Sequence, residues 1–217
     1  MPPADGAEGR ALRAFAGAML GEIAHELNNR LATMRETVGL LDDLARAGKA
    51  GAAGTARAHA SLDDQVGRAL NIVRTLGGLG DALGAAPAGA FDAGTAVADL
   101  LGMTERWARR RSLRLERDIA AGLPAAAGDP ALFLCLAHRL LERCTAGLEP
   151  GGTVLVRVHA TDARIGVHLV PTGRRERGEG AASGDHDEID RELALRLGGG
   201  LVFEGGGALT ILLAAAR

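Results

Sequence analysis

The amino-acid sequence predicts an α+β fold, with a helical hairpin in its first part and helices over a mixed or antiparallel sheet in its second. Two long segments carry apolar residues at alternating spacings of four and three, which is typical of helices that pack along a seam. Several short segments after residue 110 alternate apolar and polar residues, which is typical of strands. The 217 residues are 47% hydrophobic but only 2% aromatic, so we expect a core built from Leu, Val, Ile and Ala.

Charge, hydropathy and cysteine content argue against several classes of partner. The net charge is -2 and the pI is about 6.3, which gives no argument for a nucleic-acid partner or for an anionic membrane. No segment approaches the roughly 18 consecutive apolar residues of a membrane span, and the apolar segment 14–20 is too short to indicate a signal peptide. Cys135 and Cys144 lie in one apolar helical pattern, and we expect both to be reduced and buried. These features predict a cytoplasmic protein with no nucleic-acid partner, no membrane partner and no metal site.

The first part of the chain is predicted to be a dimerising hairpin. Residues 1–10 are polar and contain proline, which indicates a loose tail, and residues 11–86 hold the two helical patterns, separated by the glycine-rich stretch 48–55. One hairpin leaves its seam half covered, so we expect two copies to form a four-helix bundle. The expected seam residues are Leu20, Ala24, Leu27, Leu31, Met34, Val38 and Leu41 in the first helix, and Leu62, Val66, Ala69, Val73, Leu76 and Leu83 in the second.

The second part, residues 87–217, is predicted to be a separate α+β unit. The glycine-rich segment 77–90 indicates a hinge before it. Asp129 followed by Pro130 is a typical start of a helix, and glycines after residue 197 are a typical end. The expected elements are helices over 91–111, 128–148 and 189–198, and strands over 112–119, 153–160, 164–170, 201–204 and 208–214.

The segment LGEIAHELNNRLATM, residues 20–34, places polar residues inside the first helical pattern. His25 falls outside the apolar seam, Asn29 lies four residues on and shares its face, and Glu26 is close enough to reach an imidazole nitrogen. An exposed imidazole is largely neutral and nucleophilic near pH 7, and a neighbouring carboxylate can orient it and accept its proton. These residues fit a histidine that accepts a phosphoryl group, although geometry alone leaves open a solvated polar face.

The motif AHELNNRLA resembles the phosphoacceptor motif of sensor histidine kinases, in which His-Glu-Leu is followed by two variable residues and usually by Pro-Leu. The resemblance implies that His25 is the phosphoacceptor, that Glu26 is the adjacent acid or base, and that Asn29 assists phosphotransfer and dephosphorylation. Arg30 stands where the family usually has proline. The segment 91–133 resembles the opening of the ATP-binding domain that follows in these kinases, including its Gly-Asp-Pro.

The positions that bind nucleotide in that family are altered here. Arg139 and Arg143 stand where the family has asparagines facing the phosphates and Mg²⁺, and an arginine side chain has no acceptor for a cation. Pro171 replaces the aspartate that bonds the adenine, and the acidic segment 184–193 replaces a glycine-rich loop. We therefore expect a degenerate ATPase-like α/β sandwich that binds no ATP. A new anion site, formed by Arg139 and Arg143 with residues 174–177, remains an alternative.

An intact phosphoacceptor beside a degenerate ATPase-like domain resembles the dimeric histidine phosphotransferases of the ChpT type. The resemblance implies a homodimer that moves phosphoryl groups between receiver-domain aspartates, with Mg²⁺ supplied by the receiver and with an upstream hybrid kinase. Two alternatives remain open: a divergent sensor kinase that still phosphorylates itself, and a non-catalytic scaffold that binds response regulators. His159 and His168, on two predicted strands, are expected to face each other without a third metal ligand.

Overall fold

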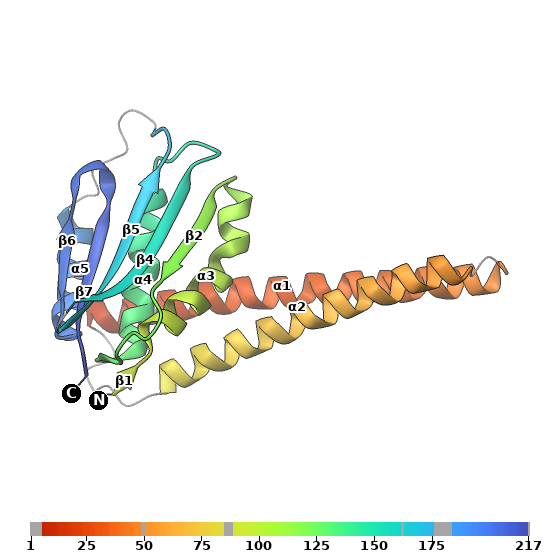
Figure 1. Cartoon of the computed structure of the whole chain (residues 1–217), viewed down its shortest axis with the longest axis horizontal. Helices are drawn as coiled ribbons and strands as arrows, with labels where there is room; N and C mark the ends of the chain where they lie inside the picture. Colours follow the sequence, from red (N-terminus) through yellow and green to blue (C-terminus); the bar gives the residue numbers. More distant parts are fainter. Residues whose placement is uncertain (1–5, 49–50, 85–88, 162, 176–183, 217) are drawn as a thin grey trace.

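The computed structural model describes residues 6–48, 51–84, 89–161, 163–175 and 184–216. Two long helices, α1 (Ala7–Arg46) and α2 (Ala52–Gly84), lie side by side and project as a rod from an α/β part (Figure 1). Residues 7–10, expected to belong to a loose tail, are helical instead, and Glu8 pairs with Arg196 at 2.6 Å. Among the described helices, none is both long and apolar enough to cross a membrane.

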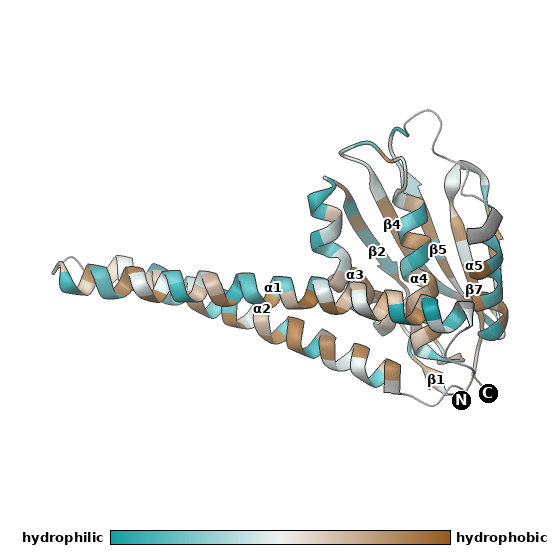
Figure 2. Cartoon of the chain, turned by 180° about the vertical axis from the view of Figure 1, so that it is seen from behind, coloured by the Kyte–Doolittle hydropathy of each residue, from teal (hydrophilic) through white to brown (hydrophobic). Residues whose placement is uncertain are grey.

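The α/β part is built on a five-stranded mixed sheet with the strand order β2-β4-β5-β7-β6. Strands β2 and β4 are parallel, and the other neighbours are antiparallel. Helices α3, α4 and α5 lie against this sheet (Figure 2), and two short strands, β1 and β3, pair with each other beside it. The bounds are β1 Ala90–Phe91, α3 Ala93–Arg110, β2 Arg114–Ile119, β3 Ala126–Ala127, α4 Pro130–Thr145, β4 Thr153–Thr161, β5 Arg164–Thr172, α5 Gly184–Arg196, β6 Gly200–Phe203 and β7 Leu209–Ala214, with a 3-10 turn at Gly205–Gly207.

The predicted helix signals are confirmed where side chains cap the ends. The Asp129 carboxylate accepts hydrogen bonds from the backbone of Ala131 at 2.8 Å and Leu132 at 3.3 Å, so α4 begins at Pro130 as expected. Asp92 caps α3 in the same way by accepting from the Thr95 backbone at 2.9 Å. Gly198 ends α5 at a φ of 65°, a left-handed conformation that glycine adopts without strain.

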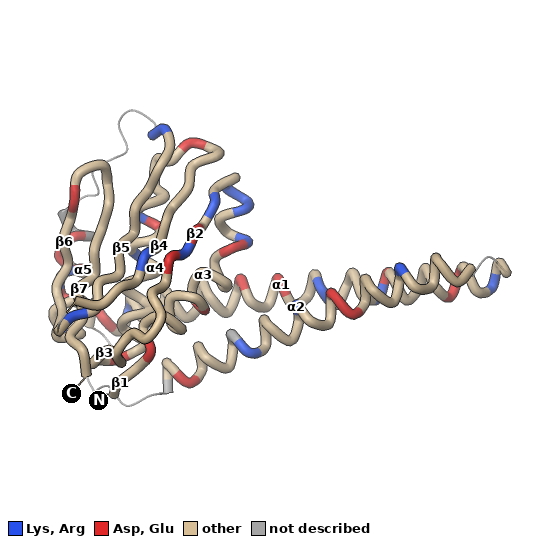
Figure 3. Tube along the Cα trace, in the orientation of Figure 1, with Lys and Arg blue, Asp and Glu red and all other residues tan. Residues whose placement is uncertain are grey.

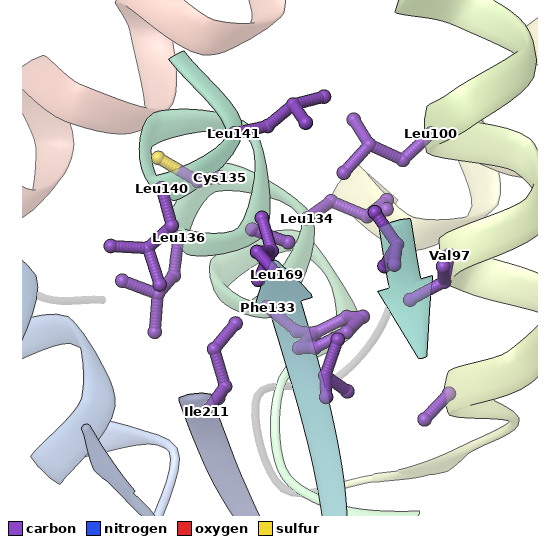
Figure 4. Packing of buried hydrophobic residues seen from close by; sticks show 14 of the residues in the cluster. Val97, Leu100, Phe133, Leu134, Cys135, Leu136, Leu140, Leu141, Leu169 and Ile211 are labelled. Atoms are coloured by element: carbon purple, nitrogen blue, oxygen red, sulfur yellow. The ribbon is translucent and has the colours of Figure 1, made fainter. Parts of the chain in front are cut away.

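Helix α4 is the centre of the core, since it is buried on nearly every side (Figure 4). Its face with Phe133, Leu136 and Leu140 contributes to one apolar cluster with strand residues such as Leu169 and Ile211. The same cluster includes residues from the base of the rod: Phe15, Met19 and Ile23 of α1, and Leu79 and Ala82 of α2. The rod and the α/β part therefore share one core, which holds α1 in a defined position beside α3.

The hinge predicted over 77–90 is wrong for its first half. Helix α2 continues to Gly84, and both Leu79 and Ala82 are buried in the shared core, so this glycine-rich segment is a packed helix end. A helix can contain glycine in its interior when tertiary packing compensates the backbone entropy that glycine loses on folding. Residues 85–88, where the expected boundary between the two parts falls, lie outside the described residues.

The predicted seam of the rod divides into two sets of residues. One set is partly buried and includes Leu27, Met34, Leu62 and Leu76. The other set stays about half exposed, and we call it the apolar stripe. It consists of Leu20, Leu31 and Val38 on α1 and Val66, Val73 and Leu83 on α2.

Candidate functional site

His25 lies on the exposed surface of α1, near the point where the rod meets the α/β part. Ile23, two residues before it, is buried in the shared core, and Leu27, two residues after it, is partly buried against α2. The helical period therefore turns His25 away from both apolar contacts, as the sequence predicted. An imidazole at this position is open to a partner that approaches the rod from the side.

The neighbours Glu26 and Asn29 lie on α1 as predicted, but the carboxylate of Glu26 bonds arginine side chains rather than His25. Its carboxylate accepts from Arg30 Nε at 2.7 Å and lies 3.5 Å from Arg106 Nη1. Arg30 in turn donates to Gln65 of α2 at 3.1 Å, which ties the pair to the second helix of the rod. Glu26 is thus the acceptor of two arginines, with 19% of its side chain exposed.

Arg106 of α3 is the residue that contacts the imidazole, and the sequence reasoning missed it. Its Nη2 lies 2.7 Å from His25 Nε2. With the amide oxygen of Asn29 turned toward the guanidinium, that oxygen lies 2.7 Å from Nη1 and 3.1 Å from Nη2. Because a guanidinium only donates, Nε2 of His25 is the acceptor and the ring proton is on Nδ1. His25, Glu26 and Asn29 therefore converge on one arginine from the α/β part.

A second link fixes α3 beside α1. Arg110, four residues after Arg106 and so on the same face of α3, forms an ion pair with Glu22 of α1. Figure 3 shows basic residues along the later part of α3. The only signal in the sequence was the basic run TERWARRR at 104–111, which does not indicate a partner 81 residues away.

A cleft of about 500 Å³ opens between α1, α2 and α3 beside this cluster. Its wall includes Glu26 and Arg106, the two groups next to the histidine motif, as well as Asp64 and Arg68 of α2. Its wall contains both acidic and basic side chains, and the apolar side chains of Ile23, Ile72 and Met103. The cleft therefore lies next to Arg106, the residue that contacts His25, and it offers both charged and apolar surface.

The positions that the resemblance to sensor histidine kinases aligns with a nucleotide site hold an internal ion-pair cluster. Arg139 Nε lies 2.7 Å from Asp190 Oδ1, and Arg143 Nη1 lies 2.7 Å from Asp190 Oδ2. Arg143 Nη2 also reaches Asp187 at 2.5 Å. Asp190 is fully buried, with 0% of its side chain exposed. We call these four residues, two on α4 and two on α5, the Arg–Asp cluster.

The Arg–Asp cluster is neutral overall, since two guanidiniums meet two carboxylates. Burial works against the charge of Arg143, but its hydrogen bonds to Asp190 and Asp187 outweigh burial and raise its pKa. The Phe203 ring lies 5.0 Å from the same guanidinium and covers it. Arg139 and Arg143 thus have their carboxylate partners within the chain, which argues against the alternative of a new anion site.

The remaining residues of the expected nucleotide site take structural places. Pro171 lies in β5 opposite Val154 of β4. Arg175 donates to the backbone oxygen of Cys144 at 3.1 Å, and residues 176 and 177 of the basic segment lie outside the described residues. Cys135 and Cys144 are free and buried, as predicted, and burial raises the pKa of each thiol to about 12.

His159 and His168 face each other, as the strand prediction indicated, with ring centroids 4.5 Å apart and planes within 10°. Burial, together with the neighbouring imidazole, lowers the pKa of His168. Stacked rings hold their nitrogens side by side rather than converging on one point, which does not suit a shared metal ion. In the described part of the chain, no group of three or more potential metal ligands is gathered.

The comparisons with known proteins bear on the fold. No family model matches the sequence, and no curated protein matches it. The histidine kinase AdeS of Acinetobacter baumannii aligns over 89% of this chain and 98% of its own, with 15% identity and a TM-score of 0.50. The chain has the fold of a histidine kinase.

Two further solved structures align with the chain at lower TM-scores. A mycobacterial sensor histidine kinase, MprB, aligns over 60% of this chain and 99% of its own, with 20% identity and a TM-score of 0.47. A structure described as a bacterial phosphotransferase aligns over 92% of this chain and 95% of its own, with 15% identity and a TM-score of 0.44. The conclusion on architecture therefore depends on the alignment with AdeS, and the activity has to be argued from the site.

Proposed function

We propose that the chain is a histidine phosphotransferase of a two-component phosphorelay, of the ChpT type, that works in the cytoplasm without binding ATP. The observation that carries this proposal is the contrast between two sites on one chain. His25 is exposed and surrounded by polar groups, whereas the place of the nucleotide is filled by the Arg–Asp cluster. A histidine that takes no phosphoryl group from ATP needs another donor, and a phospho-aspartate of a receiver domain is chemically suited.

The proposed transfer takes place at Nε2 of His25. The lone pair of Nε2 attacks phosphorus, the bond between phosphorus and the aspartate oxygen breaks, and its electron pair leaves with the carboxylate. The proton on Nδ1 stays in place during this step. The transfer to a second receiver is the same reaction in reverse: an aspartate oxygen attacks phosphorus, and the bond to Nε2 breaks. The receiver brings its own Mg²⁺, which neutralises charge on the phosphoryl oxygens.

The apolar stripe supports the proposal of a homodimer. The six residues of the apolar stripe are about half exposed on one rod, and all six belong to the predicted seam, whose spacing is typical of two interacting helices. Two rods packed along the stripe form a four-helix bundle with the symmetry of a dimer. The faces that carry His25 remain outside and are free to dock receivers.

The kinase alternative rests on one observation, namely that the aligned structure with the TM-score of 0.50 is a kinase. It requires that ATP displace the Arg–Asp cluster, which would leave Asp190 buried without partners at a large desolvation cost. A scaffold that only binds response regulators is chemically compatible with the same surface, and it is separated from the transferase by the test below.

The test is phosphoryl transfer from a purified receiver that has been phosphorylated and freed of nucleotide. The wild-type chain is expected to gain one acid-labile phosphoryl group while the receiver loses its own, and His25→Ala is expected to gain none. Asn28→Ala, which alters an exposed neighbour in the same motif, is the matched control and should keep transfer. A His25→Ala variant that is labelled as fast as wild type, or a wild-type chain that binds receivers without ever being labelled, would overturn the proposal.

A further inference from the structure

We infer that Arg106 is a catalytic residue that binds the phosphoryl oxygens once the group is on His25, so that the α/β part completes the transfer site without nucleotide. This inference rests on the proposed function, because it requires a phosphoryl group on His25. It assigns to α3 a task that does not depend on ATP.

The position of the guanidinium is the first argument. Arg106 Nη2 lies 2.7 Å from the nitrogen that forms the bond to phosphorus. A phosphoryl group on that nitrogen places its oxygens in the space that Nη2 now faces. Those oxygens only accept hydrogen bonds, and a guanidinium only donates, in a fork that matches two oxygens at once. A small shift therefore exchanges a bond to the ring nitrogen for bonds to phosphoryl oxygens.

The support around Arg106 is the second argument. Asn29 holds both terminal nitrogens, at 2.7 and 3.1 Å, and Glu26 lies 3.5 Å from Nη1. The Arg106 side chain is only 21% exposed, so it is held in place rather than free in solvent. Glu26 and Asn29 thus act as positioning residues through Arg106. This explains why Glu26 bonds arginines although it is next to the histidine.

The link from Arg110 to Glu22 is the third argument. It anchors α3 to α1 one helical turn beyond Arg106, and the shared core fixes both helices at their base. An arginine held in this way loses little further conformational freedom when it binds a phosphoryl group. The α/β part therefore contributes a preorganised cation to phosphoryl transfer at His25, although the Arg–Asp cluster occupies the positions aligned with a nucleotide site.

The experiment loads the full-length chain with phosphoramidate, a small donor that transfers its phosphoryl group to histidine and releases ammonia. Phosphohistidine is then followed by ³¹P NMR against pH in wild type, Arg106→Ala and Arg106→Lys. Because a cation beside the phosphoryl group favours its fully ionised form, the titration midpoint should lie about one pH unit higher in Arg106→Ala than in wild type. Arg106→Lys should restore part of the difference, and Arg111→Ala, an exposed arginine of the same basic run, should titrate as wild type.

The second readout is the equilibrium with a phosphorylated receiver. Loss of one charge-assisted hydrogen bond should shift it toward the receiver by about tenfold or more in Arg106→Ala. An unchanged midpoint and equilibrium would overturn the inference alone. Faster transfer to Arg106→Ala with an unchanged midpoint would overturn it too, since Arg106 would then only cover the histidine. If phosphoramidate labels the wild-type chain but no phosphorylated receiver does, the proposed relay is overturned, and the titration midpoint still decides the role of Arg106. If neither donor labels the wild-type chain, both the proposed relay and the role of Arg106 are overturned.

Discussion

At the scale of single residues, the proposed loss of nucleotide binding depends on Asp190. Its two oxygens each accept from a different arginine, and it is the fully buried member of the Arg–Asp cluster. A buried carboxylate is tolerated only when its hydrogen bonds are satisfied, and here Arg139 and Arg143 satisfy both. We therefore expect the same arginines that are unsuited to Mg²⁺ to stabilise the fold through this carboxylate.

We predict that Asp190→Asn destabilises the chain by about 2–3 kcal/mol, measured as the free energy of unfolding in urea. Removing one partner of a buried pair usually costs about 3–5 kcal/mol. The smaller value is expected because Arg139 and Arg143 keep 21% and 19% of their side chains exposed. Glu188→Gln, an exposed acid on the same helix, is the control and should change stability by less than about 0.5 kcal/mol. Equal stability of the two variants would show that the cluster is not structural.

At the scale of elements, most of the longer helices and strands were predictable, because periodicity and capping are local, whereas the short strands β1 and β3 were not predicted. The signals at Asp129, Pro130 and Gly198 each mark a helix end that the structure confirms. The hinge predicted over 77–90 was wrong for its first half, because burial of Leu79 and Ala82 overrides the low helix propensity of glycine. Likewise, periodicity gave the seam but not its division into a buried set and an exposed set, which depends on how α1 and α2 pack.

The exposed set leads to a prediction about assembly. Leu31→Glu combined with Val73→Glu places charges on two residues of the apolar stripe that are each 51% exposed in the single chain. If the stripe is the dimer interface, the double variant should elute as a monomer in size exclusion with light scattering, while wild type is a dimer. Leu195→Glu, on α5 and 72% exposed, should remain a dimer. A double variant that stays dimeric would place the interface elsewhere.

Helix α4 also makes stability depend on pH, through His138. Burial lowers the pKa of this histidine, and Glu142 at 3.7 Å opposes the shift only in part. The unfolded chain then binds the proton more readily, so this contribution is present above the ordinary pKa of 6.5 and is lost as pH falls below it.

We expect the thermal midpoint of wild type to fall between pH 7.5 and pH 5.5, and to fall less in His138→Phe. Phenylalanine keeps a ring beside Phe15, whose centroid lies 5.5 Å away, but takes up no proton. The lowered pKa of His168 leaves part of the pH dependence in place. His59→Ala, an exposed histidine on α2, should behave as wild type. An identical pH dependence in His138→Phe and wild type would show that His138 does not contribute.

At the scale of the whole molecule, the part that the sequence did not predict is the contact between its two halves. His25, Glu26 and Asn29 were found from their spacing within one helix. Arg106 was not, because its place beside His25 depends on the core that packs α1 and α2 against the α/β part. The resemblance to sensor histidine kinases drew attention to Arg139 and Arg143, but their pairing with Asp187 and Asp190 needed the relative placement of α4 and α5.

The central claim is that the phosphoryl group on His25 comes from a receiver and not from ATP. The most direct measurement incubates the purified chain with radiolabelled ATP and Mg²⁺, alone and then with a hybrid kinase and its receiver domain, with His25→Ala beside each. The account predicts no label from ATP alone at any time point, and label on wild type but not on His25→Ala once the kinase and receiver are present. Label on wild type from ATP alone, lost in His25→Ala, would contradict the account and make the chain a kinase.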